Sequence, residues 1–317
     1  MKVLVVKTSS MGDILHTLPA ITDACNNIPR IEFDWVIEEA FAEIPTWHPG
    51  INNAIPFAWR RWRKNIFTLP FNPEWQQFRK TLQQQKYDFI IDAQGLIKSA
   101  IVTKMAYGMR CGFDRYSVRE RLASLAYNKN FPVEKKQHAI TRIRKLFALT
   151  LDYSFDKNNI DYGVKAPLEE TNLPRNYSVF IVNTSRKNKQ WPIANWRKLL
   201  EEMQIKKQTV IIPEGYQHER HKIQEIISGF NNIIVLPQGD LTQVFNLLAN
   251  AKAVVSVDTG LAHLAAALNK PNITLYGPTN EHLIGTAGKN QIHLKSDHDK
   301  VDIASEVVWK ELQPLLY

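Results

Sequence analysis

The sequence predicts an α/β protein of two domains, each built on a parallel β-sheet with helices on both faces. Length is the first observation, because 317 residues suit two domains of roughly 150 residues each. The second is the alternation of short β-branched runs with helical segments, since repeated βα units form parallel sheets. The third is a polar stretch with little periodicity at residues 151–176, which indicates a linker. We therefore expect domains at residues 1–164 and 165–317.

The expected elements follow from the apolar runs and their spacing. The first domain opens with a strand at residues 3–6, and a helix begins near Ile14. Further strands are expected at residues 31–38, 53–57 and 87–92, a glycine-bearing turn at 93–96, and helices at 72–86 and 137–150. In the second domain we expect strands at residues 178–182, 209–212, 232–236, 253–257 and 272–276, and helices at 194–203, 217–228, 241–250, 261–268 and 302–316.

The composition is typical of a globular protein that binds an anion. Apolar residues make up 44% of the chain and charged residues 22%, and no apolar run has the roughly 18 residues that span a bilayer. A strand at the start and two cysteines lead us to expect a cytoplasmic protein with no signal peptide, disulfide framework or zinc site. Residues 1–164 hold 23 Lys and Arg against 16 Asp and Glu, and residues 165–317 hold 17 against 15. The basic first half indicates nucleic acid, an anionic membrane or a phosphorylated substrate as a partner, or else an unpartnered solvated surface.

The loop after the first strand is the leading candidate for a site. It contains Gly12 and Asp13 at the carboxyl end of the strand, where backbone N–H groups and a helix dipole favour ligand binding. The alternative is that Asp13 only caps the helix.

A second candidate follows a buried strand in the other half. There Asp258, Thr259 and Gly260 precede a helix rich in alanine and leucine, so that Gly260 allows close backbone approach and Thr259 adds a hydroxyl. Capping by Asp258 is the alternative. An aspartic protease would need two such acids in all-β surroundings, and the chain has one Asp-Thr-Gly.

Three further segments could contribute to a site. The loop from Thr184 to Pro192 offers two hydroxyls and three cations, which suit a diphosphate, or it is a plain solvated basic loop. Residues 276–279 form another glycine-bearing turn on the same edge, or a plain turn. The third segment carries four cations, Arg60, Arg61, Arg63 and Lys64, which could bind phosphates. Its two tryptophans, Trp59 and Trp62, could contact sugars, lipid or bases. The alternative is a charged helix face whose aromatic side chains have no ligand.

Several enzyme classes lose support because their motifs are missing. The run His218-Glu219-Arg220-His221 is not the His-Glu-x-x-His metal signature. The sequence contains no Gly-x-Gly-x-x-Gly, Walker A or Gly-x-Ser-x-Gly pattern. A nicotinamide dehydrogenase, a P-loop ATPase and a serine hydrolase are therefore disfavoured.

Taken together, these motifs resemble a known family. Ser-Ser-Met-Gly-Asp-Ile-Leu-His-Thr-Leu-Pro, Ser-Val-Asp-Thr-Gly-Leu-Ala-His and Tyr-Gly-Pro-Thr are similar to motifs of the bacterial lipopolysaccharide heptosyltransferases of glycosyltransferase family 9. Val-Lys-Thr-Ser-Ser-Met-Gly-Asp, Ile-Asp-Ala-Gln-Gly-Leu-Ile-Lys-Ser-Ala and Arg-Arg-Trp-Arg-Lys resemble the members that add the first heptose. The resemblance runs essentially end to end.

The resemblance implies a GT-B fold, in which two Rossmann-like domains face each other across a cleft. It implies inverting transfer of L-glycero-D-manno-heptose from ADP-heptose, held by the second domain, to the Kdo sugar of Kdo-lipid A, held by the first. No metal or other cofactor is expected. The family further suggests a monomer, peripheral on the cytoplasmic face of the inner membrane, whose last helix can pack back on the first domain.

The same resemblance assigns residues to roles. Asp13 is the expected catalytic base, and Lys189 is expected to neutralise the leaving diphosphate. The expected donor site comprises Thr184, Ser185, Lys189, Glu219, Asp258, Thr259, Gly260, Leu261 and His263, with Glu219 on the nucleotide ribose. The expected acceptor site comprises Ser10, Gly12, Arg60, Arg61, Arg63, Lys64 and Arg119.

Three alternatives stay open. A related transferase could add the second heptose or use another nucleotide-sugar. The basic charge also suits a nucleic-acid-binding protein, although no nucleic-acid module is visible and a phosphorylated glycolipid explains the charge equally well. A non-catalytic lipid A-binding protein is disfavoured by the intact Asp13 and Asp258 turns.

Overall fold

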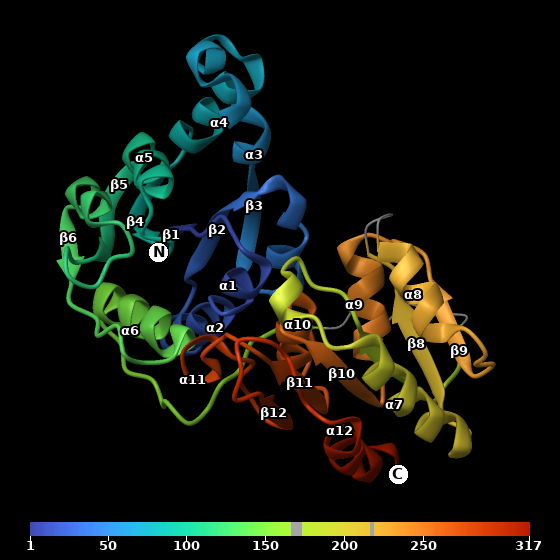
Figure 1. Ribbon diagram of the computed structural model, residues 1–317. Coiled ribbons are helices and arrows are strands. Elements are labelled where there is room, and N and C mark those ends of the chain that lie inside the picture. Colours follow the sequence, from blue (N-terminus) through green and yellow to red (C-terminus); the bar gives the residue numbers. More distant parts are fainter. Residues whose placement is uncertain (166–172, 216–218) are drawn as a thin grey trace. The chain divides into compact units, whose positions relative to one another are not determined.

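The computed structural model describes residues 1–165, 173–215 and 219–317, apart from the side chain of Ile66. The chain forms two compact units, Met1–Lys165 (unit 1) and Ala166–Tyr317 (unit 2) (Figure 1). The sequence places the division after residue 164, and residues 166–172 of the predicted linker lie outside the described residues.

Unit 1 is built on a six-stranded sheet in the order β3-β2-β1-β4-β5-β6, and the paired strands are parallel. The strands are β1 (Lys2–Val6), β2 (Glu32–Glu38), β3 (Ile51–Phe57), β4 (Lys86–Asp92), β5 (Tyr107–Phe113) and β6 (Lys129–Phe131). The first four confirm the predicted strands.

Helices cover both faces of this sheet. On one face α4 (Pro73–Gln83) and α5 (Ile97–Met105) enclose a core that includes Leu4, Phe57 and Phe78. The crossover from β1 to β2 runs in the opposite direction along the sheet, so the right-handed rule places α1 (Met11–Leu15) and α2 (Leu18–Asn27) on the other face. There α2 packs against α6 (Ala139–Leu151). Shorter helical segments are η1 (Glu39–Phe41), η2 (Ile44–Trp47), α3 (Trp59–Trp62), η3 (Arg63–Phe71) and η4 (Arg121–Ala126).

Unit 2 repeats the architecture, with parallel strands in the order β12-β11-β10-β7-β8-β9. The strands are β7 (Tyr177–Ile181), β8 (Thr209–Pro213), β9 (Ile233–Leu236), β10 (Ala253–Val257), β11 (Asn272–Tyr276) and β12 (Gln291–Lys295). The helical segments are η5 (Lys187–Lys189), α7 (Ile193–Ile205), α8 (Arg220–Ile227), α9 (Leu241–Ala249), α10 (Gly260–Ala267), α11 (Glu281–Ile284), α12 (Ser305–Leu312) and η7 (Gln313–Leu316).

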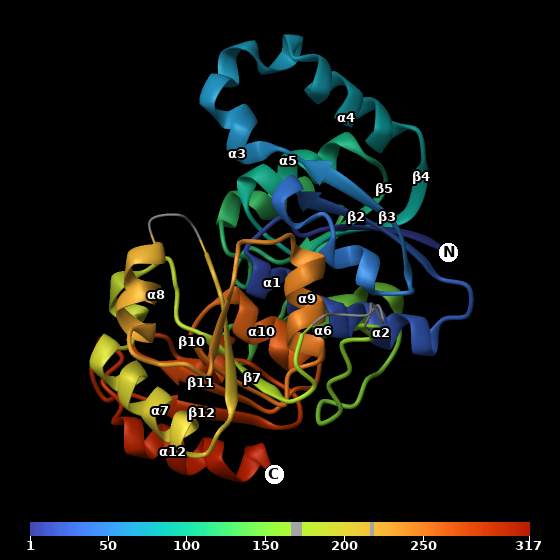
Figure 2. The same cartoon turned by 90° about the vertical axis from the view of Figure 1, so that its right-hand side faces the viewer.

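The predicted helix at residues 217–228 corresponds to α8, and residues 217 and 218 lie outside the described residues. The last helix, α12, packs against α7 and contributes Val308 and Leu312 to the core of unit 2 (Figure 2). In the same core Trp191 meets Trp196 edge to face and donates its indole N–H to the carbonyl of Ile303 at 2.8 Å. These contacts fix the loop that carries Lys189 to the body of unit 2. In the described part of the chain, no helix has the length and apolar character that crossing a membrane requires.

Candidate active site

Asp13 lies in α1, just beyond the carboxyl end of β1. Its Oδ2 accepts hydrogen bonds from the backbone N–H of Ser10 at 3.1 Å and from the Ser10 hydroxyl at 3.0 Å. Asp13 therefore does cap its helix, as the alternative interpretation expected, because it forms a capping box with Ser10. The side chain keeps 34% of its accessible surface, so the carboxylate is held in place and still reachable.

A buried lysine lies beside this carboxylate. Lys7 Nζ is 3.7 Å from Asp13 Oδ1 and donates to the carbonyl of Ala93 at 3.1 Å. Burial tends to raise the pKa of Asp13, but Lys7, the two bonds from Ser10 and Arg119 outweigh it and hold that pKa below its usual value. Burial in turn lowers the pKa of Lys7. The Asp13 carboxylate is therefore ionised at neutral pH.

The loop that carries Asp13 is fixed by residues that the sequence interpretation did not assign. The side-chain oxygen of Gln94 accepts from the backbone N–H groups of Thr8 and Ser9 at 3.0 and 3.2 Å. Gln94 itself is held by Asp92, whose Oδ1 accepts from the backbone N–H groups of Gln94 and Gly95, both at 2.9 Å. The signal in the sequence was the glycine turn at residues 93–96, which follows β4 as Asp13 follows β1.

Basic side chains lie near Asp13. Lys98, on α5, donates to the hydroxyl of Ser9 at 3.3 Å, and it was not among the predicted site residues. Burial lowers the pKa of Lys98, and the positive charges of Arg60, Arg63 and Arg119 lower it further. Arg119 also acts electrostatically on Asp13. Predicted acceptor residues from two distant segments therefore gather around the loop of Asp13.

The four basic residues between positions 60 and 64 differ in the contacts that they make within unit 1. Arg61 is bound by two carboxylates, with NH2 3.0 Å from Glu39 and NH1 2.5 Å from Glu74. Arg60 donates its backbone N–H to Glu38 and lies 5.4 Å from the ring of Phe41. Arg63 and Lys64 are exposed at the start of η3. Arg61 therefore forms ion pairs within unit 1, whereas the side chains of Arg63 and Lys64 are accessible to an anion.

The two tryptophans of this segment pack against the hydrophobic core of unit 1. Trp62 is 5% exposed, meets the rings of Phe57, Trp75 and Phe78, and donates its indole N–H to Glu74 at 3.0 Å. Trp59 stacks on Phe57 with ring centroids 5.8 Å apart. The idea that Trp62 contacts a sugar, lipid or base is wrong, because packing against neighbouring aromatic side chains covers its ring.

In unit 2, Asp258 is the centre of a buried polar cluster at the end of β10. Its Oδ2 accepts from Lys189 Nζ at 2.6 Å and from the hydroxyl of Thr279 at 2.5 Å. Its backbone carbonyl accepts from the hydroxyl of Thr184 at 3.2 Å. The three predicted loops after β7, β10 and β11 therefore meet at one carboxylate.

Further polar residues and a helix N-terminus lie around this cluster, at the carboxyl ends of the strands of unit 2. Ser185 is exposed beside the buried Thr184. Lys295 on β12 donates to the carbonyls of Gly277 and Thr279, which fixes the turn after β11. Thr259 is the extended N-cap residue of α10, Gly260 and Leu261 open that helix, and His263 is buried one turn later. A helix N-terminus with small residues presents backbone N–H groups to an anion.

A further cluster of polar groups lies at the ends of β7 and β8. Asn183 Nδ2 is buried there and has no hydrogen-bond partner among the described residues. A Cβ added at Gly215 would lie 1.8 Å from Glu219 Oε2 and 3.5 Å from Asn183 Nδ2, so all three residues are close together. Lys222 donates to the carbonyl of Val182 at 2.9 Å nearby. The place is suited to a ligand hydroxyl or ring nitrogen that would pair with Asn183.

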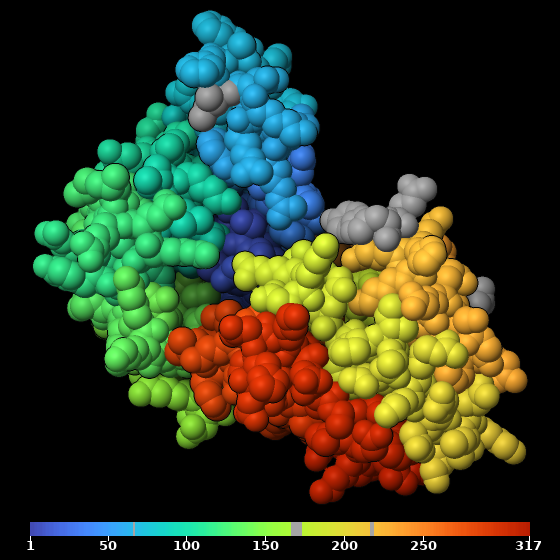
Figure 3. All heavy atoms as spheres, in the orientation of Figure 1, coloured from blue at the N-terminus to red at the C-terminus, as the bar shows by residue number. Residues whose placement is uncertain are grey.

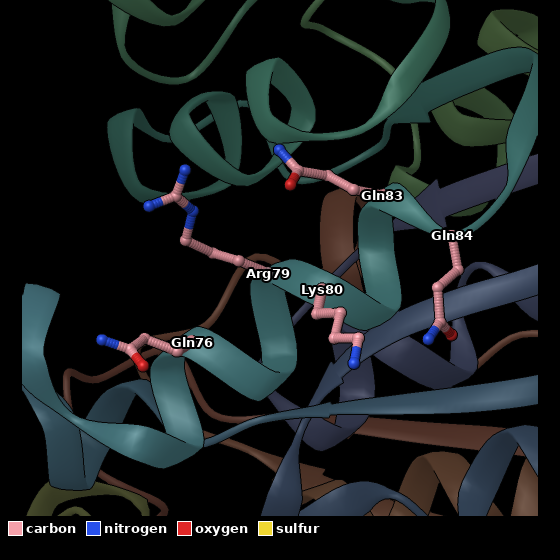
Figure 4. Close-up of a pocket in the computed structure, with 5 residues that line it drawn as sticks. All are labelled: Gln76, Arg79, Lys80, Gln83 and Gln84. Carbon is pink, nitrogen blue, oxygen red and sulfur yellow. The ribbon is translucent and has the colours of Figure 1, made fainter.

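Two hollows in the described surface of unit 1 are not lined by Asp13. One is a shallow depression on α4 lined by Gln76, Arg79, Lys80, Gln83 and Gln84 (Figure 4). The other lies between β3 and α4 and is lined by residues that include Asp34, Tyr87 and Arg61. There the Tyr87 hydroxyl donates to Asp34 at 2.8 Å. The candidate site is defined by side-chain chemistry at strand ends, not by these hollows.

Comparison with known proteins settles the family. A family model described as Glycosyltransferase family 9 (heptosyltransferase) matches residues 75–307. The chain belongs to glycosyltransferase family 9. Its match to lipopolysaccharide heptosyltransferase 1 of Escherichia coli strain K12 is 48% identical and covers 99% of this chain and 100% of that protein.

Solved structures of this family agree. The Escherichia coli heptosyltransferase WaaC with ADP superposes with a TM-score of 0.94 at 46% identity, over 99% of this chain and 100% of that one. The same enzyme with ADP-2-deoxy-2-fluoro heptose gives 0.91 at 45% identity, over 99% of both chains. The family-9 protein is therefore a glycosyltransferase with a GT-B fold, as the sequence motifs implied. The family model begins after Asp13 and Arg60, and the full-length relatives extend the match to them.

Proposed function

We propose that this family-9 glycosyltransferase moves L-glycero-D-manno-heptose from ADP-heptose to the Kdo sugar of Kdo-lipid A, with inversion at the anomeric carbon. The observation that carries the proposal is the carboxylate of Asp13, ionised and held by Ser10 beside Lys7. The similarity to heptosyltransferases 1, one of them solved with an ADP-heptose analogue, supports the donor and the reaction class.

Asp13 would act as the general base. An acceptor hydroxyl attacks the anomeric carbon, its oxygen forms the new glycosidic bond, and its proton passes to Asp13. The bond from the anomeric carbon to the phosphate oxygen breaks, and ADP leaves with the electron pair. The oxocarbenium-like transition state and the leaving diphosphate both need charge stabilisation.

Unit 2 would hold the donor. Lys189 is the cation for the diphosphate, and the N-terminus of α10 with Thr259 and Gly260 offers backbone N–H groups. Lys189 is paired with Asp258, so a diphosphate would compete for its ammonium group. Among the described residues, both hydrogen bonds to the Asp258 carboxylate end on Oδ2, so Oδ1 would be available to a heptose hydroxyl.

We further propose that transfer needs no metal. Lys189 supplies the positive charge that a divalent ion would otherwise bring to the diphosphate. Among the described residues, no group of three or more His, Cys, Asp or Glu side chains is arranged to hold a metal ion. Turnover that survives dialysis against EDTA supports this, and turnover restored only by a divalent cation contradicts it.

On the acceptor side, Arg63, Lys64, Lys98 and Arg119 are the proposed partners of the Kdo carboxylates and lipid A phosphates. Lys98 and Arg119 act at the loop of Asp13, so an anionic sugar bound to them would lie near the base. A membrane-borne acceptor also implies that the enzyme works at the cytoplasmic face of the inner membrane.

The test is ADP release from ADP-heptose, with O-deacylated Kdo-lipid A present or absent. Release that depends on the acceptor, with a glycolipid that gains one heptose by mass, supports the proposal. A preference for an acceptor that already carries one heptose would identify an enzyme for the second addition. Release without any acceptor dependence would contradict the assigned acceptor.

A further inference from the structure

A segment of unit 1 projects from the rest of that unit and ends in exposed aromatic rings. The segment comprises residues 59–80, that is α3, η3 and most of α4, light blue to teal in the figures (Figures 1 and 3). On η3, Phe67 is 94% exposed and Phe71 is 81% exposed, more than any other large apolar side chain described. A soluble surface rarely leaves two neighbouring phenylalanines in water without a partner to cover them.

The base of this projection is firmly built. Trp62, Trp75 and Phe78 pack ring against ring with centroids 5.5 to 5.8 Å apart. The side chain of Asn72 caps α4 by accepting from the N–H groups of Glu74 and Trp75. Gln76 Nε2 donates to the carbonyl of Pro70 at 3.0 Å, which ties η3 to α4. Phe67 and Phe71 are therefore held outward by a packed base.

The charge of the projection is strongly positive. Residues 59–80 contain six cations, at Arg60, Arg61, Arg63, Lys64, Arg79 and Lys80, and one acid, Glu74. That acid is paired with Arg61. Arg79 and Lys80 extend from α4 one turn beyond Gln76, beside the shallow depression already described (Figure 4). Arg63, Lys64, Arg79 and Lys80 have no ion-pair partner among the described residues. Exposed aromatic rings together with such basic side chains match an anionic lipid surface, with an apolar interior below charged headgroups.

We propose that this projection inserts into the surface of an anionic phospholipid bilayer. Phe67 and Phe71 enter the boundary between headgroups and acyl chains, and Arg63, Lys64, Arg79 and Lys80 bind the lipid phosphates. Its purpose rests on the proposed function, because an enzyme that acts on a membrane glycolipid must hold its first unit against the bilayer. The binding itself needs no acceptor.

The proposal differs from purely electrostatic attachment in its response to salt. Screening weakens the attraction of Lys and Arg for anionic headgroups, whereas it does not weaken burial of a phenylalanine ring. Each ring that leaves water strengthens binding by about ten-fold, from the cost of exposing a large apolar side chain. Salt should therefore weaken the binding of this protein to vesicles without abolishing it.

The experiment is sedimentation of the full-length protein with vesicles of phosphatidylcholine and phosphatidylglycerol that contain no acceptor. The test variant is F67S/F71S. The matched control is I205S/Y317S, which removes two exposed apolar side chains from unit 2, 71% and 79% exposed. We expect the wild type and the control to bind alike, with part of the binding left at high salt. F67S/F71S should bind about 100-fold more weakly, with nothing left at high salt.

Wild-type binding by F67S/F71S would overturn the proposal, and so would complete removal of the wild type by salt. Self-association through the same rings, seen as a larger species of the wild type without vesicles that F67S/F71S abolishes, would also overturn it. Transfer to O-deacylated Kdo-lipid A in solution separates the two proposals. F67S/F71S should retain the wild-type rate there, whereas a wild type that binds vesicles but transfers no heptose removes only the proposed function.

Discussion

Ser10 donates both its backbone N–H and its hydroxyl to one oxygen of Asp13, Oδ2, at 3.1 and 3.0 Å. The other oxygen, Oδ1, is the one that lies 3.7 Å from Lys7 Nζ. This arrangement fixes the carboxylate in one orientation and keeps it ionised. If Asp13 acts as the proposed base, it has the required ionised form at neutral pH, and its lowered pKa weakens the driving force for proton transfer.

Lys7→Met should move the acid limb of the kcat/KM profile to higher pH. The lowered pKa of Asp13 keeps the base ionised until the pH falls through that lowered value, and Lys7 is the largest cause of the lowering. Without the lysine charge the pKa of Asp13 rises, so protonation and loss of activity begin at a higher pH. Rates measured across the acid range, with Lys2→Met as the exposed control, test this. An unchanged limb would mean that Asp13 is not the titrating base.

Lys189→Met should weaken ADP binding and destabilise unit 2. Lys189 and Asp258 are 15% and 8% exposed, so the variant leaves a buried carboxylate without its ion-pair partner. Loss of one member of a buried pair costs about 3–5 kcal/mol of unfolding free energy. Lys187→Met, an exposed cation in the same short helix, is the matched control and should change little. Calorimetric titration with ADP and thermal denaturation are the measurements, and equal effects of the two variants would remove the special role of Lys189.

Arg61→Ala should lower the stability of the protein, whereas Arg63→Ala should weaken acceptor binding. Arg61 links Glu39 and Glu74, so its loss should lower the melting temperature and change the acceptor KM little. Arg63 is exposed and acts electrostatically near Lys98, so its loss should raise the acceptor KM without changing the melting temperature. A rise in acceptor KM for Arg61→Ala with unchanged stability would reverse this assignment.

Asn183→Ala should weaken ADP-heptose binding by about ten-fold while leaving the free protein as stable as before. The buried Nδ2 group has no hydrogen-bond partner in the part of the chain that the structure describes, so its removal from the free protein breaks no described hydrogen bond. A bound ligand that pairs with it would lose that bond in the variant. Melting temperatures with and without ADP separate the two states. A destabilised free protein with unchanged ADP affinity would show that Asn183 has a structural role only.

The sequence predicts the fold well where burial dictates the pattern. Strands β1, β7 and β10 are apolar runs buried in the middle of their sheets, and all three were predicted. Strand β5 was not predicted, because its two glycines and Arg110 interrupt the apolar pattern. Strands β6 and β12 were missed because β6 has three residues and β12 is a half-exposed edge strand.

The site could be predicted only in part, because pairing between distant side chains leaves no local signal. Asp13 and Asp258 stand at visible strand ends. Nothing near Arg61 in the sequence shows that Glu39 and Glu74 will hold it, and nothing near Lys98 shows that it will reach Ser9. Trp62 looked like a ligand contact because its local neighbours are cations, whereas its contacts in space are aromatic rings.

Asp13 is the proposed base in heptose transfer to Kdo-lipid A, and the variant Asp13→Asn tests that role. The amide oxygen of asparagine can still accept from Ser10, so the loop should keep its fold, but the amide cannot take a proton. The measurement is the mass gain of O-deacylated Kdo-lipid A with saturating ADP-heptose, together with binding of the donor. We predict that the wild type adds one heptose, and that Asp13→Asn binds donor normally but transfers roughly 100- to 10,000-fold more slowly. Transfer by Asp13→Asn at the wild-type rate would show that Asp13 is not the base.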